Sequence, residues 1–526
     1  MTEQRKNYYE ELIDNMMIEG IKGMDDAETA SLKAYLKTTT VHEKRTKILK
    51  ALVENNEEKV KLFREIQEEE QKRKEIKGYS MTPTCHIANV ITMLRRYVEF
   101  GDVEIKTMGE VMTPITLVEE MLDQLPDNVW TNPSLRWLDP CNGAGIFVSI
   151  IVQRLLKGLV NFEPDEDLRY KHIMENMIYV GELQPKNMFL YLYAFDPKDE
   201  LDLNIYCGSY LTSEFDLHMK DVYGVEKFDI VVMNPPYNSG GDNVRGIGHT
   251  LWDKFVMKAL EISLIADGYL VAVHPDGWRS LGKGFNKVKN LLKSLQMLYL
   301  EVHNKKDGIK TFGVNTAYDF YCVRNKENLG NFITRIKCEN KIIKNEDGEL
   351  KNIGGKNERV DISKMEFIPN GMYDAFQKLM PKKGEEQVTL LHSESAYEIR
   401  KSYMSKEQTE VFKYPCVYLT YKDGTMKLKY SSINTKGYFG IPKVIFSNGI
   451  SMPVVDIEGK YAMTQFSYAI VDDVQNLERI KQAMLNPEFL KLMTFSDGVT
   501  IGGGGHRYNR KAIALFKKDF YIDFLK

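Results

Sequence analysis

The stretch LRWLDPCNGAGIF occupies residues 135–147 and decides how the middle of the chain folds. Its apolar beginning reads as a short strand that ends at Asp139. Gly143 and Gly145 then permit a tight turn and a close approach of the backbone to a ligand. A helix is expected from about Ile146. The stretch therefore predicts a strand–turn–helix unit of the nucleotide-binding type, a signal that is weak alone because many such turns bind nothing.

Similar apolar runs alternate with helix-length segments between about residues 105 and 325. The runs are LRWLDP (135–140), NMIYVGEL (176–183), NIYCGSYL (204–211), FDIVVMNPP (228–236) and GYLVAVHP (268–275). This alternation predicts an α/β fold, in which a mostly parallel sheet is covered by helices on both faces. Ligands bind such sheets at the carboxyl ends of the strands, so the residues that follow each strand are the candidates for function.

Composition sets the outer limits on fold class and compartment. The 526 residues are enough for two to four domains of roughly 100–200 residues each. With 71 basic and 74 acidic residues the formal net charge is −3, so any DNA-binding surface must be locally segregated. No two of the six cysteines are spaced as CxxC, so neither a metal site nor a disulfide framework is expected. Without a signal peptide or an apolar run of about 18 residues, the expected location is the cytoplasm.

The regions before and after the middle of the chain differ from it in residue composition and in expected secondary structure. Residues 1–80 are expected to be helical and charged. Their run REIQEEEQKRKEIK (64–77) is either a solvated helix or a docking helix for a partner or for DNA. Residues 81–328 form the α/β domain, and 329–526 a separate α+β, β-rich domain with a hairpin turn at 422–424 and a helix around 474–494. Residues 400–443 include nine basic and three acidic residues, which gives this stretch a formal charge of +6.

The segment MNPPY at 233–237 carries the strongest chemical signal. Pro235 and Pro236 have fixed φ angles and no N–H, so the turn is stiff and presents its carbonyl groups. Asn234 adds an amide oxygen, and Tyr237 adds a flat ring. Together they suit a planar amino group that donates hydrogen bonds while its ring is stacked. The alternative is a Pro-Pro turn beside a buried tyrosine. Glu182, at the end of another strand, suits the two hydroxyls of a ribose.

In this order the motifs resemble the gamma class of adenine-N6 DNA methyltransferases of restriction–modification systems. The matching segments are GEVMTP (109–114), DPCNGAGIF (139–147), GEL (181–183), NPPY (234–237), LWDKF (251–255), GYLVAVHPDGW (268–278) and KTFGVNTAYDFYCV (310–323). The resemblance covers residues 105–325 well and the C-terminal part loosely. It implies a Rossmann-like methyltransferase domain that binds S-adenosylmethionine, followed by a target recognition domain.

The resemblance also implies a role for individual residues. Asn234, Pro235, Pro236 and Tyr237 would be catalytic. Cofactor-binding residues would be Thr113 and Pro114 at the methionine end, Asp139, Gly143, Gly145, Glu182 at the ribose, Ser209 and Tyr210. At the last position the chain departs from the family, because an acid usually binds the amino group of the cofactor's adenine ring where this chain has Gly208, Ser209 and Tyr210. Ser209 is left to accept that hydrogen bond.

The implied substrate is an adenine flipped out of double-stranded DNA. Tyr237 and Phe312 would stack on its two faces, although Phe312 also fits a core aromatic beside an apolar strand. Lys422, Lys427, Lys429, Arg507 and Arg510 would contact DNA. The last two lie in GGGGHRYNRK (502–511), which otherwise reads as a surface loop before a final helix. The resemblance implies neither a metal ion nor a membrane. It allows a separately encoded restriction enzyme as a partner. The implied host is a bacterium or a phage-infected cell.

Several alternatives stay open at this point. The chain could be the modification subunit of a multi-subunit system, which would need a separate specificity chain. It could methylate cytosine N4, RNA or a protein glutamine, since the chemistry of Asn234 permits these amines as well. A combined nuclease and methyltransferase is disfavoured. Glu104-Ile-Lys106 resembles the end of a nuclease signature, but it runs straight into GEVMTP and leaves no room for a nuclease core. A DNA-binding protein without catalysis would not need an intact NPPY.

Overall fold

The computed structural model describes two compact units. The structure describes residues 8, 82–99, 112–197, 200–238, 250–281, 284–344, 350–393, 397–398, 400–447, 451–496 and 508–525. The first unit comprises Met1–Pro275 and Asn290–Thr334, and the second Asp276–Lys289 and Arg335–Lys526. The helical region expected over 1–80 lies outside the described residues, apart from Tyr8. The contacts divide the chain at Thr334, six residues beyond the expected boundary at 328, and the functional division into domains stays a prediction.

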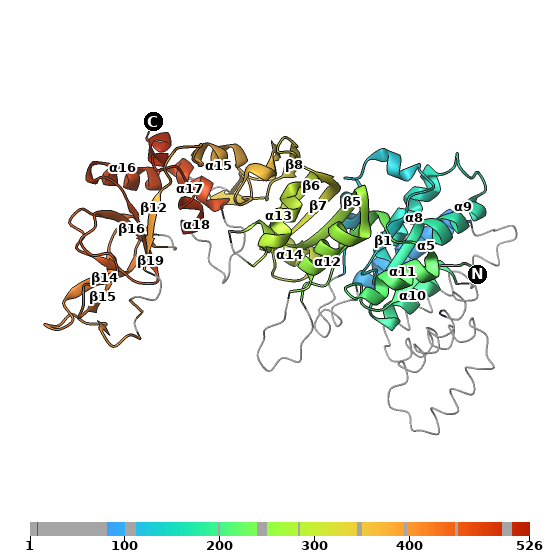
Figure 1. Ribbon diagram of the computed structural model, residues 1–526, viewed down its shortest axis with the longest axis horizontal. Coiled ribbons are helices and arrows are strands. Elements are labelled where there is room, and N and C mark those ends of the chain that lie inside the picture. The colour runs from blue at the N-terminus through green and yellow to red at the C-terminus, as the bar shows by residue number, and fades with distance from the viewer. Residues whose placement is uncertain are drawn as a thin grey trace, which may run out of the picture. The chain divides into compact units, whose positions relative to one another are not determined.

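Seven strands of the first unit are neighbours in a doubly wound sheet, in the order β6-β7-β5-β4-β1-β2-β3. Figure 1 labels β1, β5, β6 and β7 of these strands. They are β1 (Trp137–Asp139), β2 (Ile178–Glu182), β3 (Asn204–Cys207), β4 (Phe228–Met233), β5 (Leu264–Pro275), β6 (Leu295–His303) and β7 (Tyr318–Glu327). The pairs from β3 through β5 are parallel, whereas β7 is antiparallel to both β5 and β6. The predicted α/β fold is confirmed.

The strand order reverses between β1 and β4, which places the ends of these strands side by side. Residues of β1, β2 and β4 are almost all buried, as expected for parallel strands covered on both faces. The crevice at such a switch point is where open α/β sheets bind ligands. The fold therefore directs attention to the segments after Asp139, Glu182 and Met233.

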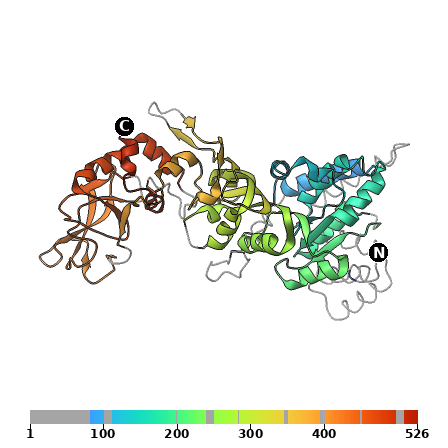
Figure 2. The same cartoon turned by 45° about the horizontal axis from the view of Figure 1, so that its top comes forward.

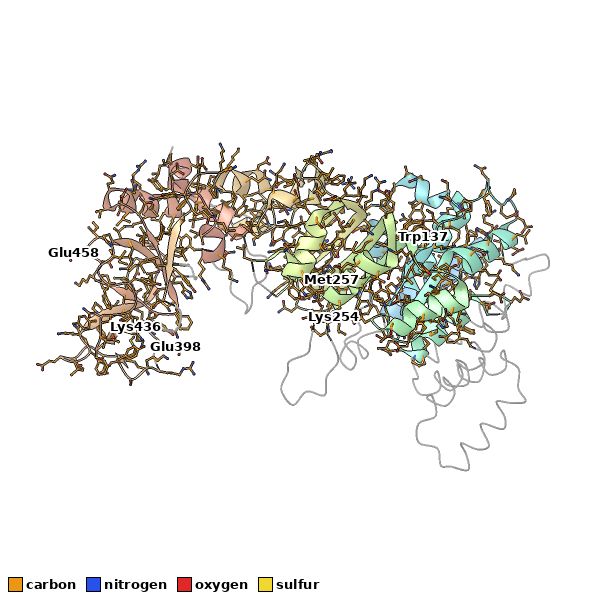
Figure 3. All side chains as sticks on the ribbon, viewed as in Figure 1. Trp137, Lys254, Met257, Glu398, Lys436 and Glu458 are labelled. Atoms are coloured by element: carbon orange, nitrogen blue, oxygen red, sulfur yellow. The ribbon has the colours of Figure 1, made fainter. Side chains whose placement is uncertain are left out.

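Helices connect and cover these strands. Their bounds are α5 (Pro83–Glu99), α7 (Ile115–Leu122), α8 (Ile146–Gly158), α9 (Glu166–His172), α10 (Pro185–Phe195), α11 (Ser213–Tyr223), α12 (Trp252–Lys258), α13 (Asn286–Ser294) and α14 (Lys305–Phe312). Helix α8 packs against α5, α7 and α9. The core beneath them includes Trp137 of β1, labelled in Figure 3, whose ring stacks on Trp130 with centroids 5.0 Å apart.

The second unit is rich in short strands. They are β8 (Thr334–Lys337), β9 (Ile342–Lys344), β10 (Leu350–Asn352), β11 (Asn357–Val360), β12 (Thr389–His392), β13 (Met404–Ser405), β14 (Tyr414–Thr420), β15 (Met426–Ser431), β16 (Lys443–Ser447), β17 (Val454–Asp456), β18 (Ala462–Met463) and β19 (Ser467–Val471). Two four-stranded sheets have the orders β12-β19-β16-β17 and β13-β15-β14-β18. The hairpin expected at 422–424 is confirmed as the turn between β14 and β15, where Gly424 has a φ of 82°.

The second unit also contains helices. They are α15 (Tyr373–Leu379), α16 (Val474–Leu485), α17 (Pro487–Thr494) and α18 (Arg510–Ile513). Helix α16 packs on β16 and β17, and both views show α16 and α17 along the same side of the strands (Figures 1 and 2). The single helix expected around 474–494 is two helices, because Pro487 has no N–H to continue α16 and instead begins α17 under an Asn486 cap.

Candidate active site

A cavity of about 460 Å³ opens at the carboxyl ends of β1, β2, β3 and β4. Nine of the residues singled out from the sequence line it together: Thr113, Gly143, Glu182, Ser209, Tyr210, Asn234, Pro235, Pro236 and Tyr237. Pro114, Asp139, Gly145 and Phe312 are not part of the lining. The cavity also has an apolar wall that includes Ile146, Phe147, Leu211 and Phe255.

The turn after β1 needs its glycines. Gly145 has a φ of 96°, and a Cβ there would lie 2.6 Å from the Phe195 ring, so the start of α8 can approach α10 only without a side chain. Gly143 has a φ of 55°. Its N–H donates to Glu182 Oε2 at 2.8 Å, and the N–H of Gln184 donates to the other carboxylate oxygen at 2.7 Å. Glu182 thus ties the ends of β1 and β2 together at the edge of the cavity.

Asp139 lies beneath this turn rather than in the cavity wall. Its Oδ1 accepts the N–H of Cys141 at 3.2 Å, and its Oδ2 is buried without a hydrogen-bond partner among the described residues. Burial, together with repulsion from Glu182, raises the pKa of Asp139 to about 8. Pro114 is also absent from the cavity wall. It precedes α7, and its carbonyl oxygen accepts hydrogen bonds from the N–H groups of Leu117 and Val118.

The turn after β4 brings Asn234 against a residue 121 positions earlier in the chain. Asn234 Nδ2 donates to Thr113 Oγ1 at 2.9 Å. Because Thr113 is buried, this contact fixes the plane of the amide and turns its nitrogen toward Thr113. The amide oxygen is the other terminal atom of the group, and it is buried. Sequence reasoning placed both residues in the site, but it could not foresee that one holds the other.

Tyr237 contributes its ring to the cavity and buries its hydroxyl. The hydroxyl has no hydrogen-bond partner among the described residues, and burial with repulsion from Tyr318 raises the pKa of the phenol well above its ordinary value. The phenol therefore stays protonated at every physiological pH. The part of Tyr237 that faces the cavity is an aromatic surface, which favours stacking over proton transfer.

The loop after β3 is held by a buried lysine that sequence reasoning missed. Lys258 of α12 is 8% exposed, and its Nζ donates to the carbonyl oxygens of Tyr210 and Thr212 at 2.6 and 2.9 Å and to Asp216 at 2.8 Å. The Tyr210 hydroxyl is hydrogen-bonded to Ser263 Oγ at 2.7 Å. The one sequence signal was a lysine within the apolar segment WDKFVMK. This lysine fixes the segment that carries Ser209 and Tyr210 into the cavity.

Phe312 is not placed as a stacking residue. It is 3% exposed at the end of α14 and packs edge-on against Tyr318, with ring centroids 4.8 Å apart. A residue that stacks on a base needs an open ring face, and both faces of Phe312 are covered. The alternative named from the sequence, a core aromatic beside β7, describes its position.

The predicted DNA-binding residues occupy different environments in the second unit. Lys422 and Lys427 are exposed on the β14–β15 hairpin. Lys429 is 8% exposed, and its Nζ lies 5.5 Å from the centre of the Tyr418 ring, so little of it is offered to a phosphate. Arg510 begins α18 and lies over the Tyr468 ring, 4.8 Å from its centre. Arg507 lies outside the described residues.

Comparisons with known proteins find distant relatives. No protein-family profile matches the sequence. An uncharacterised adenine-specific methylase of Mycoplasma pneumoniae is 25% identical over 372 residues, which cover 57% of this chain and 84% of the relative. The structure of the M protein of the type I restriction enzyme EcoKI is 17% identical, with a TM-score of 0.33, over 45% of this chain and 50% of that one. The chain thus spans about half the length of that subunit.

A second solved structure covers more of the chain. The type IIL restriction–modification enzyme MmeI, in complex with DNA, is 11% identical, with a TM-score of 0.43, over 83% of this chain and 70% of that one. In the parts of the chain that the structure describes, no helix is both long and apolar enough to cross a membrane. The same parts contain no cluster of three or more His, Cys, Asp or Glu side chains suited to a metal ion.

Proposed function

We propose that the chain transfers a methyl group from S-adenosylmethionine to the exocyclic N6 of an adenine in double-stranded DNA. The observation that carries the proposal is the single cavity that joins the NPPY turn after β4 to Glu182 and the glycine turn after β1. The similarity to an adenine-specific methylase supports the same activity. A cavity of about 460 Å³ falls within the usual range of about 300–1,000 Å³ for small-molecule sites.

The residues of the cavity fit this cofactor. Glu182 is held by two backbone N–H groups at the end of β2, where a carboxylate can accept hydrogen bonds from two ribose hydroxyls. Phe255 and Leu211 offer an apolar wall to an adenine ring, and Ser209 beside them offers a hydroxyl to its amino group. Gly143 leaves room for the backbone to approach the ligand. The bound cofactor supplies an electrophilic methyl group on a cationic sulfur that departs neutral.

The protein's part in the reaction is to activate and orient the amine. The lone pair of an aromatic amine is delocalised into its ring, which makes the nitrogen a poor nucleophile. Hydrogen bonds from the amino protons to the Asn234 amide oxygen and the Pro235 carbonyl favour a tetrahedral nitrogen and free the lone pair. Positive charge that develops on the nitrogen strengthens both bonds in the transition state, and the methylated nitrogen then loses one of its protons to solvent. Tyr237 stacks on the flipped base and recovers part of the cost of removing it from the duplex.

Thr113 takes a positioning role in this arrangement. Its hydroxyl accepts from Asn234 Nδ2, so the amide enters the reaction with its oxygen already directed away from Thr113. A preorganised acceptor needs no rearrangement when charge develops on the substrate. The stiff Pro235-Pro236 backbone, which cannot donate a hydrogen bond, fixes the second acceptor in the same way.

The experiment is to express the chain in a host without DNA methylation and to sequence its genomic DNA for modified bases, with Asn234→Ala as the control. We expect N6-methyladenine in one short motif with the wild type. The variant should bind S-adenosylmethionine but lose about 3 kcal/mol or more of transition-state stabilisation, roughly a hundredfold in rate. Methylated cytosine would overturn the choice of base, and a variant as active as the wild type would overturn the site. An unmarked genome would point to a missing specificity subunit or to a substrate other than DNA.

A further inference from the structure

The loop NTKGYFG, residues 434–440 between β15 and β16, has an unusual backbone. Three of its residues have left-handed φ angles: 72° at Gly437, 63° at Tyr438 and 74° at Gly440. A left-handed conformation is strained for a bulky residue such as tyrosine. The residue Tyr438 is nevertheless 39% exposed, so it is not a core residue whose full burial would account for its presence in this loop.

Hydrogen bonds hold the loop in this shape from both sides. The carbonyl of Gly437 accepts the N–H of Met463 at 3.1 Å, and the N–H of Gly440 donates to Gly459 at 2.8 Å. A Cβ on Gly437 would lie 2.2 Å from the Tyr397 ring, so this glycine is required by the packing. The loop is therefore rigid on both sides of Tyr438.

A buried charge pair fixes Tyr438 itself. Lys443 is fully buried, and its Nζ donates to the carbonyl oxygens of Tyr438 at 3.1 Å and Ile441 at 3.0 Å. Its third partner is Asp456, at 2.9 Å. Burying two charges beneath an exposed loop is costly unless every donor is satisfied, as it is here. The chain thus uses a demanding arrangement to keep one exposed tyrosine in a strained conformation, which is a feature of functional sites.

The other non-glycine residues with positive φ among the described residues have local explanations. Asp267 forms ion pairs with Arg324 and Lys326 at 3.0 and 3.5 Å, and aspartate tolerates this conformation. Met372 is fixed at the start of α15 by its N–H, which donates to Glu358. Tyr438 differs from both, because its backbone is held through its carbonyl by the buried Lys443 while the residue itself is 39% exposed.

The surroundings of the loop suit a polyanion. A cavity of about 330 Å³ beside it is lined by Ser393 and residues 434–439. Lys436 is exposed, and its Nζ lies 5.3 Å from the centre of the Tyr403 ring. The acidic residue Glu398 lies at the same end of the second unit as Lys436 (Figure 3), but its charge is offset by Arg400, 3.9 Å away. Residues 400–443 as a whole carry a charge of +6.

We propose that Tyr438 is a DNA-contacting residue whose ring inserts at a base step of the duplex and stacks on the base that this exposes, while Lys436 contacts a neighbouring phosphate. Aromatic rings stack on bases, and lysines beside them pair with phosphates, in many nucleic-acid sites. A ring held rigidly in advance loses little entropy when it binds. The inference rests on the proposed function for the identity of the polymer, and it adds a specificity residue distant in sequence from the NPPY turn.

The test uses the full chain and two readouts, binding to a duplex and methylation of host DNA. Tyr438→Gly removes the ring and the backbone strain together, Tyr438→Phe keeps the ring, and Asp267→Gly relieves the same backbone conformation in the first unit. Binding is measured by fluorescence anisotropy on a duplex that carries the methylated motif, or on a mixed-sequence duplex if no motif is marked. Thermal unfolding and S-adenosylmethionine binding are measured on every variant.

We expect Tyr438→Gly to unfold no earlier than the wild type and to bind the cofactor equally well, but to bind the duplex roughly tenfold more weakly or worse. Tyr438→Phe and Asp267→Gly should bind the duplex as the wild type does. Lys436→Ala should lower the salt dependence of binding by about one phosphate contact. Equal duplex binding by Tyr438→Gly and the wild type would overturn the inference, as would a wild type that does not bind duplex DNA. A wild type that binds DNA but marks none would count against methylation by this chain on its own and would leave the contact of Tyr438 with DNA standing.

Discussion

At the scale of single residues, a substitution of Thr113 can distinguish two roles for this residue. Thr113 either binds the methionine end of the cofactor or positions Asn234 through their hydrogen bond. The sequence placed Thr113 at the methionine end of the cofactor, whereas its hydroxyl accepts from the Asn234 amide at 2.9 Å. Thr113→Val keeps the shape but removes the acceptor. If Thr113 positions Asn234, kcat should fall roughly ten- to a hundredfold with little change in the dissociation constant of the cofactor, measured by single-turnover methylation and calorimetry.

Thr113→Ser is the matched control for this prediction. It retains a hydroxyl at the same position and should recover most of the lost rate. A large loss of cofactor affinity in Thr113→Val with an unchanged single-turnover rate would instead support the role at the methionine end. An unchanged rate and affinity would show that the hydrogen bond has no part in catalysis.

The raised pKa of Asp139 predicts that the free energy of unfolding depends on pH. Its pKa is about 8 in the folded protein, against about 3.9 in an unfolded chain. Below about pH 4 both states hold the proton. Between about pH 4 and 8 the unfolded state has lost it while the folded state keeps it, so the free energy of unfolding falls as pH rises, by on the order of 1 kcal/mol per pH unit.

Asp139→Asn removes this contribution and keeps an oxygen for the N–H of Cys141. Urea unfolding at pH 5, 6.5 and 8 should show the wild type losing stability relative to the variant as pH rises, since groups remote from Asp139 titrate alike in the two proteins. A constant difference between the two across these pH values would contradict a raised pKa at Asp139.

Sequence reasoning identified residues whose chemistry is local and missed those that act across the fold. Asn234, Glu182 and Gly143 each follow a strand, so their convergence on one cavity follows from the parallel sheet. The distance of 121 residues between Thr113 and Asn234 leaves no local pattern for their contact. Phe312 shows the converse limit, because an aromatic in a matching segment carries no information about how far its ring is buried, and Phe312 is 3% exposed.

At the scale of elements, Lys258 makes the loop after β3 depend on α12. Lys258→Met keeps the length of the side chain but removes its donors to the Tyr210 and Thr212 carbonyls. We expect the loop that carries Ser209 and Tyr210 to loosen, which should raise the dissociation constant of the cofactor roughly tenfold and lower the melting temperature by a few degrees.

The control for this element is Lys254→Met, an exposed position on the same helix, labelled in Figure 3. It should leave cofactor affinity and melting temperature unchanged. Unchanged cofactor affinity in Lys258→Met as well, measured by calorimetry, would mean that the loop keeps its shape without the lysine.

The elements that could be predicted were those with a single dominant pattern. The apolar runs became β1 to β5, and the Lys-Asp-Gly turn became the β14–β15 hairpin. Strand β6 (Leu295–His303) was missed because its polar positions, such as Glu301, lower its apolar signal, although Glu301 is buried and accepts the Tyr299 hydroxyl at 2.6 Å. Sequence shows that Glu301 is charged but not that a neighbour satisfies it.

At the scale of the whole molecule, the problem is how a chain with a net charge of −3 binds a polyanion. The long-range field of the protein does not favour DNA, so binding has to come from a local excess of exposed cations. Residues 400–443 carry a formal charge of +6, of which Lys443 is buried and paired with Asp456, whereas Lys422 and Lys427 are exposed. Local cations that contact phosphates displace condensed counterions, which makes the affinity fall with salt in proportion to the number of contacts. The salt dependence therefore counts how many of these lysines reach the DNA.

We expect the double variant Lys422→Ala/Lys427→Ala, whose two lysines are exposed on the hairpin, to reduce the slope of log K against log salt by about 1.8, or about 0.9 for each lost contact. Lys429→Ala should change the slope much less, because its side chain is 8% exposed over the Tyr418 ring. Lys220→Ala, at an exposed ion pair with Glu226 in the first unit, serves as the control and should leave the slope unchanged. Equal slopes for the double variant and the control, measured by anisotropy on one duplex from 50 to about 300 mM salt, would show that the hairpin does not contact phosphates and that DNA binding depends on other parts of the chain.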